Sequence, residues 1–358
     1  MEEKNNLNIE KLEQKILSQN NLEDYNDINN FEEDEEFSDS NKETTSSKIK
    51  DKSKKKPNIK DDTKDNNEKW KLYLIQFGKI LLNKLYHLCI GIIAILIVLG
   101  LFIGFLNWSN DSLVITEDFY IDNNLPGSFD GYKILQISDF NNKKDLSKTL
   151  INKTKEIKPD IIVITGDYIN SDRCTEFNID YSYLEEIAKT YSVYFVPGEQ
   201  EQDSVFYEKM KTKLETMNVK VLENEVVELK KGTDSIQLMG IYDSSFFFEN
   251  ITMLNNKIKE NRKEGFTILL SHRPELIDVY TENNINLVLS GHALGGQIRF
   301  PYVGAFYSSN QGFYPDYTNG FYKQENTTVY VSRGIGNTFI PVRIFNRPEI
   351  NVIVLKNK

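Results

Sequence analysis

Two of the three histidines in this chain lie directly after short apolar runs. His272 follows the run Thr267–Leu270, and His292 follows the run Leu287–Leu289. Short apolar runs of this kind are consistent with buried strands, and a side chain just past such a strand is held at the carboxyl edge of the sheet. Because the chain has so few imidazoles, their placement after two such runs predicts a functional site.

Carboxylates follow three earlier apolar runs in the same way. Asp139 ends the motif Gln-Ile-Ser-Asp, Asp167 ends Ile-Thr-Gly-Asp, and Glu199 follows Val-Pro-Gly. Taken singly, each has a simpler interpretation as a turn former or a solvated loop charge, and a lone histidine as a hydrogen-bonded one. Together, five strand-end motifs gather carboxylates and imidazoles at one edge, and this ligand set suits Mn, Fe or Zn. The pattern therefore predicts a metal site able to clamp a phosphoryl group.

The elements that must position these residues alternate along the chain from Tyr132 onward. The candidate strands are Lys133–Ile137, Ile161–Thr165, Ser192–Val196, Ile236–Tyr242, Thr267–Leu270 and Leu287–Leu289. The candidate helices between them are Leu146–Ile157, Tyr181–Thr190, Ser204–Met217 and Met253–Arg262. This alternation predicts a mainly parallel sheet covered by helices.

After Gln297 the pattern changes to strands joined by loops rich in Gly and Tyr. The candidates here are Gln297–Phe300, Thr328–Ser332, Val342–Phe345 and Ile350–Leu355. We expect them to build a second, more antiparallel sheet, so that two sheets are sandwiched between helices. The aromatic segment Tyr302–Tyr322 then packs on the second sheet, or alternatively lines an apolar groove.

The run Leu85–Leu106 contains no Asp, Glu, Lys or Arg. Its 22 residues match the roughly 20 that a helix needs to cross a bilayer. Lysines precede the run, and neither Lys nor Arg occurs between Leu85 and Tyr132. The positive-inside rule therefore predicts a single-pass plasma-membrane protein with a cytoplasmic N-terminus and an extracytoplasmic C-terminal domain.

Composition divides the chain into three parts. Residues 1–68 are polar, with separate acidic and basic clusters, and are expected to form a disordered charged cytoplasmic tail. Residues 69–108 form the juxtamembrane segment and transmembrane helix, with its core at 85–106, and residues 112–358 are long enough to bury a domain core. The net charge of −10 argues against a nucleic-acid partner. The basic cluster in the tail is a solvated linker or a contact for anionic lipid, and partners of the tail stay open.

The order of the strand-end motifs resembles the calcineurin-like metallophosphoesterases, from about Tyr132 to the C-terminus. That family has Asp-x-His, Gly-Asp, Gly-Asn-His, a lone His and Gly-His-x-His in this order. One branch adds an N-terminal membrane helix, a Gly-His-Thr-His-Gly-Gly-Gln loop, and Arg-Gly and Phe-Asn-Arg-Pro-Glu motifs near its end. Here Gly291–Gln297 reads Gly-His-Ala-Leu-Gly-Gly-Gln, Ser332–Gly334 reads Ser-Arg-Gly, and Phe345–Glu349 keeps the last motif. The resemblance implies a four-layer α/β/β/α domain and an ancestral phosphoester hydrolase.

The chain departs from the family at the first metal position and at the proton-transfer residue. The resemblance implies that the first metal takes Asp139, Asp167 and two histidines, but Asn141 and Leu294 stand at the histidine positions. An Asn carbonyl is a weak ligand, and Leu has no lone pair. Gln200 replaces the histidine associated with transition-state stabilisation and leaving-group protonation, and Gln cannot cycle a proton near neutral pH.

The second metal position is better preserved. The resemblance implies ligands at Asp167, Glu199, His272 and His292, with Glu199 standing where the family has Asn, and with Asp139 orienting water. We therefore expect one divalent ion, either Mn, Fe or Zn. Asp139 and Gln200 are the candidate catalytic residues.

Two functions follow from these substitutions. One is a membrane-anchored phosphoester hydrolase with one metal and a reduced rate, acting on lipid- or envelope-derived phosphoesters, as the branch suggests. The other is an inactive family member that serves as a binding or scaffold protein. The retained ligands favour the first function, and the four substituted positions favour the second.

Overall fold

A computed structural model describes residues 62–243, 251–308, 311–338 and 341–358. Nearly all of the predicted charged tail, 1–68, lies outside these residues. The rest divides into two compact units, and residues 103–358 belong to the unit that contains all three sheets. The last turns of the N-terminal helix are thus part of the folded domain.

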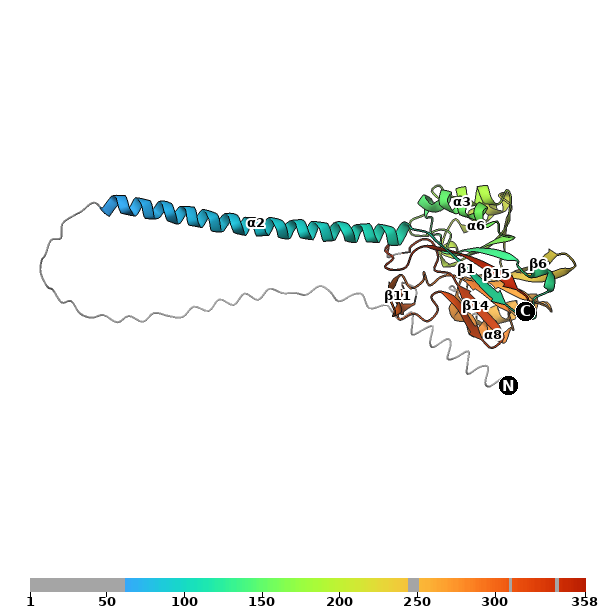
Figure 1. Cartoon of the computed structure of the whole chain (residues 1–358). Helices are drawn as coiled ribbons and strands as arrows, with labels where there is room; N and C mark the ends of the chain where they lie inside the picture. The colour runs from blue at the N-terminus through green and yellow to red at the C-terminus, as the bar shows by residue number, and fades with distance from the viewer. Residues whose placement is uncertain (1–61, 244–250, 309–310, 339–340) are drawn as a thin grey trace, which may run out of the picture. The chain divides into compact units, whose positions relative to one another are not determined.

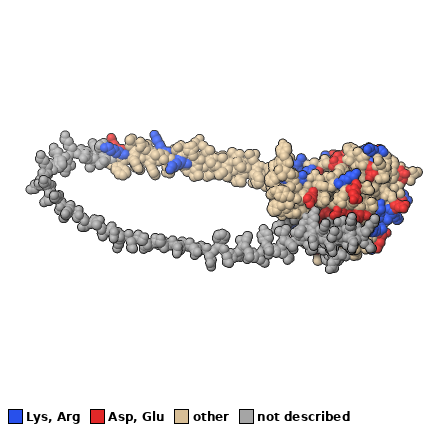
Figure 2. All heavy atoms as spheres, turned by 90° about the horizontal axis from the view of Figure 1, so that it is seen from below, with Lys and Arg blue, Asp and Glu red and all other residues tan. Residues whose placement is uncertain are grey.

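Helix α2 (Asp62–Asp111) includes the whole predicted membrane run Leu85–Leu106. The stretch Asn67–Asp111 has a best-window mean hydropathy of 3.1, and it is long and apolar enough to cross a membrane. Figure 2 shows charged side chains near the start of the helix and a long uncharged surface after them. The predicted candidate span is confirmed.

Two six-stranded sheets and one three-stranded sheet form the domain. The first sheet has the order β1 (Val114–Ile121), β15 (Glu349–Lys356), β2 (Lys133–Ile137), β3 (Ile161–Thr165), β4 (Ser192–Val196), β5 (Val219–Val221). The second has the order β13 (Gly320–Gln324), β14 (Thr327–Val331), β9 (Leu287–Ser290), β8 (Thr267–Leu270), β7 (Asp234–Gly240), β6 (Glu225–Lys231). The third consists of β10 (Ile298–Phe300), β11 (Gly304–Ser308) and β12 (Gly312–Phe313).

Helices cover the outer faces of the two large sheets. Figure 1 shows α3 (Ser147–Ile157) and α6 (Tyr207–Thr216) on one side and α8 (Ile277–Glu282) on the other. The remaining described helices of the domain are α4 (Ser182–Ile187), α5 (Glu199–Gln202) and α7 (Ile251–Asn261). Three apolar clusters lie between the layers, one under α3, α4 and α6, one between the sheets, and one under α7 and α8. The predicted four-layer α/β/β/α arrangement is confirmed.

Strand β3 shows why apolar runs rather than alternating patterns mark these strands. Ile161 and Val163 pack between the two sheets, whereas Ile162 and Ile164 pack under the outer helices. Successive side chains point to opposite faces of a strand, and both faces of this sheet are covered. The four residues from Ile161 to Ile164 must therefore all be apolar.

The prediction that the strands after Gln297 build a second, more antiparallel sheet holds only for the small third sheet, in which β10, β11 and β12 pair antiparallel. Strand β14 joins the second sheet parallel to β9, and β15 joins the first sheet parallel to β1 and antiparallel to β2. Val342–Phe345 forms no strand and contributes only one isolated bridge, between Ile344 and Ile298. Strand β15 is buried along nearly its whole length, so both of its faces need a covered position inside a large sheet.

Candidate metal centre

The five predicted strand ends meet, as expected, at the carboxyl edges of the two large sheets. Asp139, Asp167 and Glu199 follow β2, β3 and β4 of the first sheet, whereas His272 and His292 follow β8 and β9 of the second. Gln136, on β2, joins the sheets through hydrogen bonds from its Nε2 to Thr165 Oγ1 (3.0 Å) and to the Ser290 carbonyl oxygen (2.9 Å). The first sheet thus supplies the carboxylates and the second supplies the imidazoles.

Two glycines let these loops approach each other closely. A Cβ at Gly198 would collide with the carboxylate of Asp167, and a Cβ at Gly291 would collide with Ser138 Oγ and Asp139 Oδ2. Neither position can carry a larger residue without moving a predicted site residue. The Gly before Glu199 and the Gly before His292 are therefore packing requirements of the site.

Asp139, Asp167 and His272 form a compact group of possible metal ligands. One ligand atom from each lies within 4.8 Å of the other two, and all three residues are buried. His272 Nε2 lies 3.3 Å from Asp167 Oδ2. Among the residues that the structure describes, Asp139 Oδ1 has no hydrogen-bond partner, and His272 Nε2 has only this contact with Asp167. Buried polar atoms without partners are costly, so their convergence fits a divalent cation.

Hydrogen bonds orient the other atoms of this group. Asp139 Oδ2 accepts hydrogen bonds from Ser138 Oγ (2.7 Å) and from the backbone N–H of His292 (3.2 Å). Asp167 Oδ1 accepts one from the backbone N–H of Gln200 (2.9 Å). His272 Nδ1 lies 2.7 Å from the carbonyl oxygen of Thr165, which can only accept, so Nδ1 carries a hydrogen. This bond leaves Nε2 turned toward the carboxylates, as in metal-ligating histidines.

The environment shifts the protonation of the group. Burial, together with the charge of Asp167, raises the pKa of Asp139 to about 6, although His272 opposes the shift. Burial lowers the pKa of His272, but the carboxylates of Asp167 and Asp139 outweigh burial and raise it well above its usual range. Without a metal, the His272 imidazole is therefore protonated, and it supplies a positive charge beside the buried carboxyl groups of Asp139 and Asp167.

Backbone strain is concentrated at the same positions. Asp139, Asn141, Asp167, His292 and Leu294 all have φ between 47° and 69°. Asp, Asn and His tolerate this left-handed region better than other non-glycine residues, whereas Leu adopts it at a cost. Such strain often marks functional loops, and Leu294 is the residue that suits its backbone least.

Arg273 lies beside the other two predicted metal ligands. Its Nη2 is 2.9 Å from Glu199 Oε2, its Nε is 2.7 Å from Asp243 Oδ1, and its Nη1 is 3.4 Å from both Glu275 Oε1 and His292 Nε2. Burial lowers the pKa of Arg273, but these carboxylates outweigh burial and raise it, so the guanidinium stays charged. The cation beside Glu199 and His292 in this structure is a guanidinium.

His292 is accordingly neutral. Burial, followed by the positive charges of Arg273 and His272, holds the pKa of His292 well below its usual range. Its ring lies 5.0 Å from that of His272, so both imidazoles do meet at the site. The structure thus brings all five predicted residues to one place, but it divides them between the Asp139–Asp167–His272 group and the surroundings of Arg273.

Replacing Arg273 by Gln tests this division. Asp243 is fully buried, and removing one partner of a buried ion pair costs about 3–5 kcal/mol, so the metal-free variant should melt at a lower temperature. Because Glu199, Asp243 and His292 then lose the guanidinium that contacts all three, manganese should raise the melting temperature more in the variant than in the parent. Thermal unfolding with and without manganese measures both effects, and Arg262→Gln is the control. An equal manganese shift in both proteins would contradict this interpretation.

Backbone hydrogen bonds hold Asn141 and Leu294, whereas Gln200 is also held through its side chain. Asn141 donates its backbone N–H to the carbonyl oxygen of Asp167 (2.9 Å), and its side-chain Nδ2 has no partner among the described residues. Gln200 turns its Oε1 to the backbone N–H and hydroxyl of Ser171, both at 2.9 Å. The fully buried Leu294 accepts hydrogen bonds at its carbonyl oxygen from Asn346 (2.7 Å) and Arg343 (3.3 Å).

Glu201, which directly follows Gln200 in the chain, positions two loops of the site. Its fully buried carboxylate accepts hydrogen bonds from the backbone N–H groups of Asp167 (2.8 Å), Gly198 (2.8 Å) and Ile169 (3.0 Å). Burial and the charge of Asp167 raise the pKa of Glu201 to about 7, against these backbone bonds. Glu201 thus ties the loop after β3 to the loop after β4.

Replacing Glu201 by Gln should destabilise the domain. Both oxygens of the Glu201 carboxylate accept hydrogen bonds, whereas a Gln amide has only one acceptor oxygen. Its NH₂ group must then face a backbone N–H, and a buried hydrogen bond that is lost in this way costs about 1–3 kcal/mol. Denaturant unfolding measures the change, with the exposed Glu208→Gln as control. Equal stability of the two variants would show that the carboxylate is not needed to hold these loops.

Arg273 and Asp243 were missed at the sequence level. Asp243 follows strand β7 in the same way that Asp139 follows β2, so the strand-end pattern could have found it. Arg273 directly follows His272, but only the tertiary structure shows which acidic groups its guanidinium reaches.

Comparison with known proteins agrees with this geometry. The sequence model of the family described as calcineurin-like phosphoesterase matches residues 132–295. The metallophosphoesterase YkuE of Bacillus subtilis is 30% identical over 71% of this chain and 90% of its own length. The metallophosphoesterase Cj0846 of Campylobacter jejuni is 30% identical over 80% of this chain and 76% of its own.

One similar protein also bears on the N-terminal helix. A bovine protein named as a transmembrane protein with a metallophosphoesterase domain is 28% identical over 71% of this chain and 59% of its own length. The family is metal-dependent, and this chain has the possible Asp139–Asp167–His272 site for an ion. On these relatives and this arrangement of strand ends, the chain belongs to the calcineurin-like metallophosphoesterase family.

Proposed function

We propose that this chain is a membrane-anchored phosphoester hydrolase that works with one divalent ion at a reduced rate. The observation that carries the proposal is the buried group of Asp139, Asp167 and His272, with its ligand atoms within 4.8 Å of one another. Family membership supports the reaction class, and helix α2 supports the anchor.

Asp139, Asp167 and His272 would hold the ion, and it would polarise a phosphoryl oxygen and activate a water molecule. The hydrogen bond between His272 Nδ1 and Thr165 keeps Nε2 available for ligation. The Ser138 hydroxyl and the His292 N–H hold one oxygen of Asp139, so that the other oxygen stays free for the ion or for water. Ligation by Glu199 and His292, as predicted from the sequence, would require Arg273 to leave them.

The rate should be low because proton transfer lacks a suitable group. Gln200 can only orient a leaving oxygen by a hydrogen bond, and Glu201 is occupied by three backbone N–H groups. General-acid help typically contributes about 10²–10⁴-fold. The loss of this help, together with Asn141 and Leu294 at the first metal position, accounts for the slow reaction that we propose.

The substrate class follows from the membrane anchor and the branch that the sequence resembles. We infer that the substrate is a lipid- or envelope-derived phosphoester. We also infer that the N-terminal tail (1–68) lies in the cytoplasm and that the domain (112–358) lies outside the plasma membrane. The lysines before the apolar run, and their absence directly after it, support this orientation.

The second candidate is an inactive protein of this fold that binds a partner. The contacts of Arg273 with Glu199 and His292 favour it, because a guanidinium supplies the positive charge that a second metal would bring. The buried Leu294 favours it as well.

The full-length chain, purified in lipid nanodiscs, distinguishes the two candidates. The hydrolase should retain about one manganese or zinc ion per chain and should cleave bis-nitrophenyl phosphate slowly. Absence of bound metal after loading, together with absence of turnover, would reject the hydrolase and favour the binding protein.

A further inference from the structure

The small third sheet presents a continuous group of apolar side chains to solvent. This aromatic patch consists of Phe300, Tyr302, Val303, Phe313, Tyr314 and Phe345, all of which are exposed. The ring of Phe306 lies 5.4 Å from each of Phe300, Phe313 and Tyr314, so these rings form one cluster. Contiguous exposed apolar surface of this kind usually marks a site that contacts another molecule or a membrane.

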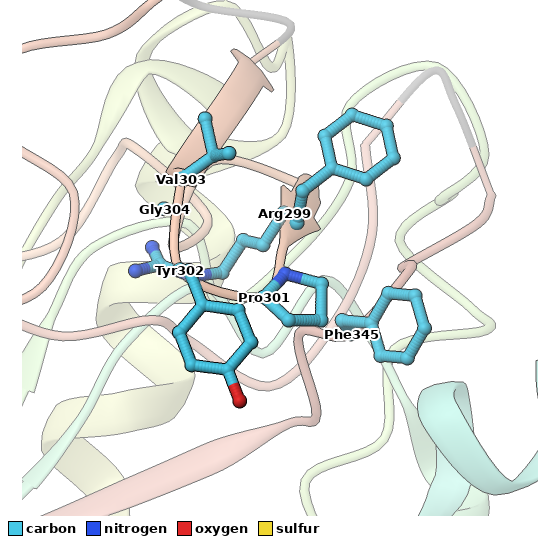
Figure 3. A pocket seen from close by; sticks show the side chains of 7 residues that line it. Arg299, Pro301, Tyr302, Val303, Gly304 and Phe345 are labelled. Atoms are coloured by element: carbon cyan, nitrogen blue, oxygen red, sulfur yellow. The ribbon is translucent and has the colours of Figure 1, made fainter.

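A hollow of about 490 Å³ forms the centre of the patch. Arg299 to Gly304, at the turn between β10 and β11, and Phe345 line it. Figure 3 shows the ring of Pro301 between those of Tyr302 and Phe345 in that view. The turn therefore exposes its ring and aliphatic side chains together, with no folded element of the described chain over them.

Contacts inside the domain unit connect this patch to the end of helix α2. The ring of Phe345 lies 4.9 Å from that of Phe105, which belongs to the apolar run Leu85–Leu106. The guanidinium of Arg347 lies 5.0 Å from the ring centre of Trp108, and Asn110 Nδ2 donates to the Arg343 carbonyl oxygen (3.2 Å). Phe345 thus contacts the end of the apolar run that is long enough to cross a membrane.

We propose that the aromatic patch seats the domain in the bilayer, by inserting into the interface of the leaflet from which helix α2 emerges. Phe345, which is half exposed, touches a residue of the membrane run itself. Tyr and Trp rings concentrate at membrane interfaces, where an apolar body and a polar tip are both satisfied. A lipid surface therefore explains the patch and its position together.

Charge agrees with a lipid partner. No Asp or Glu occurs between Ile298 and Pro315, whereas Arg299 lines the hollow and Arg347 stacks on Trp108. Basic side chains beside inserted rings match anionic head groups. The proposal rests on helix α2 crossing a bilayer, and it does not depend on catalysis.

Spin labelling of the full-length chain tests the proposal. A nitroxide at Val303→Cys, in a Cys89→Ser and Cys174→Ala background, is placed in nanodiscs of phosphatidylcholine and phosphatidylglycerol. Relaxation by oxygen, which concentrates in lipid, is compared with relaxation by a water-soluble nickel chelate. The oxygen-to-nickel ratio at Val303 should be several-fold higher than at Lys230→Cys, an exposed position on β6. Adding Tyr302→Asp and Phe313→Asp should return it to the Lys230 value.

A label at Leu96→Cys, within the apolar run, separates the possible failures. A lipid-like ratio at Leu96 with a water-like ratio at Val303 overturns the proposal and leaves the anchor intact. Water-like ratios at both positions overturn it because the helix itself is not in the bilayer. Dipolar broadening between Val303 labels would also overturn it, because a second copy of the chain would then cover the patch.

Discussion

Replacing Asp167 by Asn is expected to abolish stoichiometric manganese binding. The amide can still accept the hydrogen bond from the Gln200 N–H, so the loop geometry is kept, but a negative charge within 3.3 Å of His272 Nε2 is lost. A bound ion supplies several kcal/mol of charge stabilisation in such reactions, and about 1.4 kcal/mol corresponds to tenfold in rate. Hydrolysis should therefore fall about 100-fold or more.

Metal content and the cleavage of bis-nitrophenyl phosphate measure this effect. The matched control is Asp145→Asn, which removes an exposed carboxylate of the same domain. Unchanged thermal unfolding of the metal-free variant would show that the fold is intact. Full retention of the ion in Asp167→Asn would show that the Asp139–Asp167–His272 group is not the metal site.

Combining Asn141→His, Gln200→His and Leu294→His is expected to restore a second metal and to raise hydrolysis about 100-fold or more, since general-acid help alone is typically worth about 10²–10⁴-fold. The backbone hydrogen bonds of Asn141, Gln200 and Leu294 survive the substitutions, whereas the two bonds from Ser171 to the Gln200 side chain are lost. At position 294, where φ is 49°, His is also better tolerated than Leu.

The same triple substitution in an Asp167→Asn background is the control, and it should show no gain. Two metal ions per chain and a faster reaction in the triple variant would indicate a pocket that lost activity by side-chain substitution alone. If neither metal content nor rate increased, the contacts of Arg273 with Glu199 and His292 would be the leading reason, and the binding protein would become the better candidate.

Local patterns in the chain were enough to predict the elements and the convergence of the site. Runs such as Ile161–Ile164 are apolar at every position because both faces of their sheets are covered, and this information is contained in the run itself. The polar residues that follow such runs lie at a sheet edge because of the direction of the chain, so strand-end position predicted one site for five residues, namely Asp139, Asp167, Glu199, His272 and His292. The membrane run was equally local, since its uncharged length alone predicts a span.

Only the tertiary structure decided which strands share a sheet and which charges meet. Strand β15 lies between β1 and β2, although its partners are more than 200 positions away in the chain, because its two buried faces fit there. The pairing of Arg273 with Glu199 and Asp243, and of Glu201 with three backbone N–H groups, depends on how neighbouring loops are oriented in space. Sequence by itself determined that the five strand-end residues reach the site, because the end of each strand can be located from its apolar run. Their partners there were set by long-range packing, which periodicity does not encode.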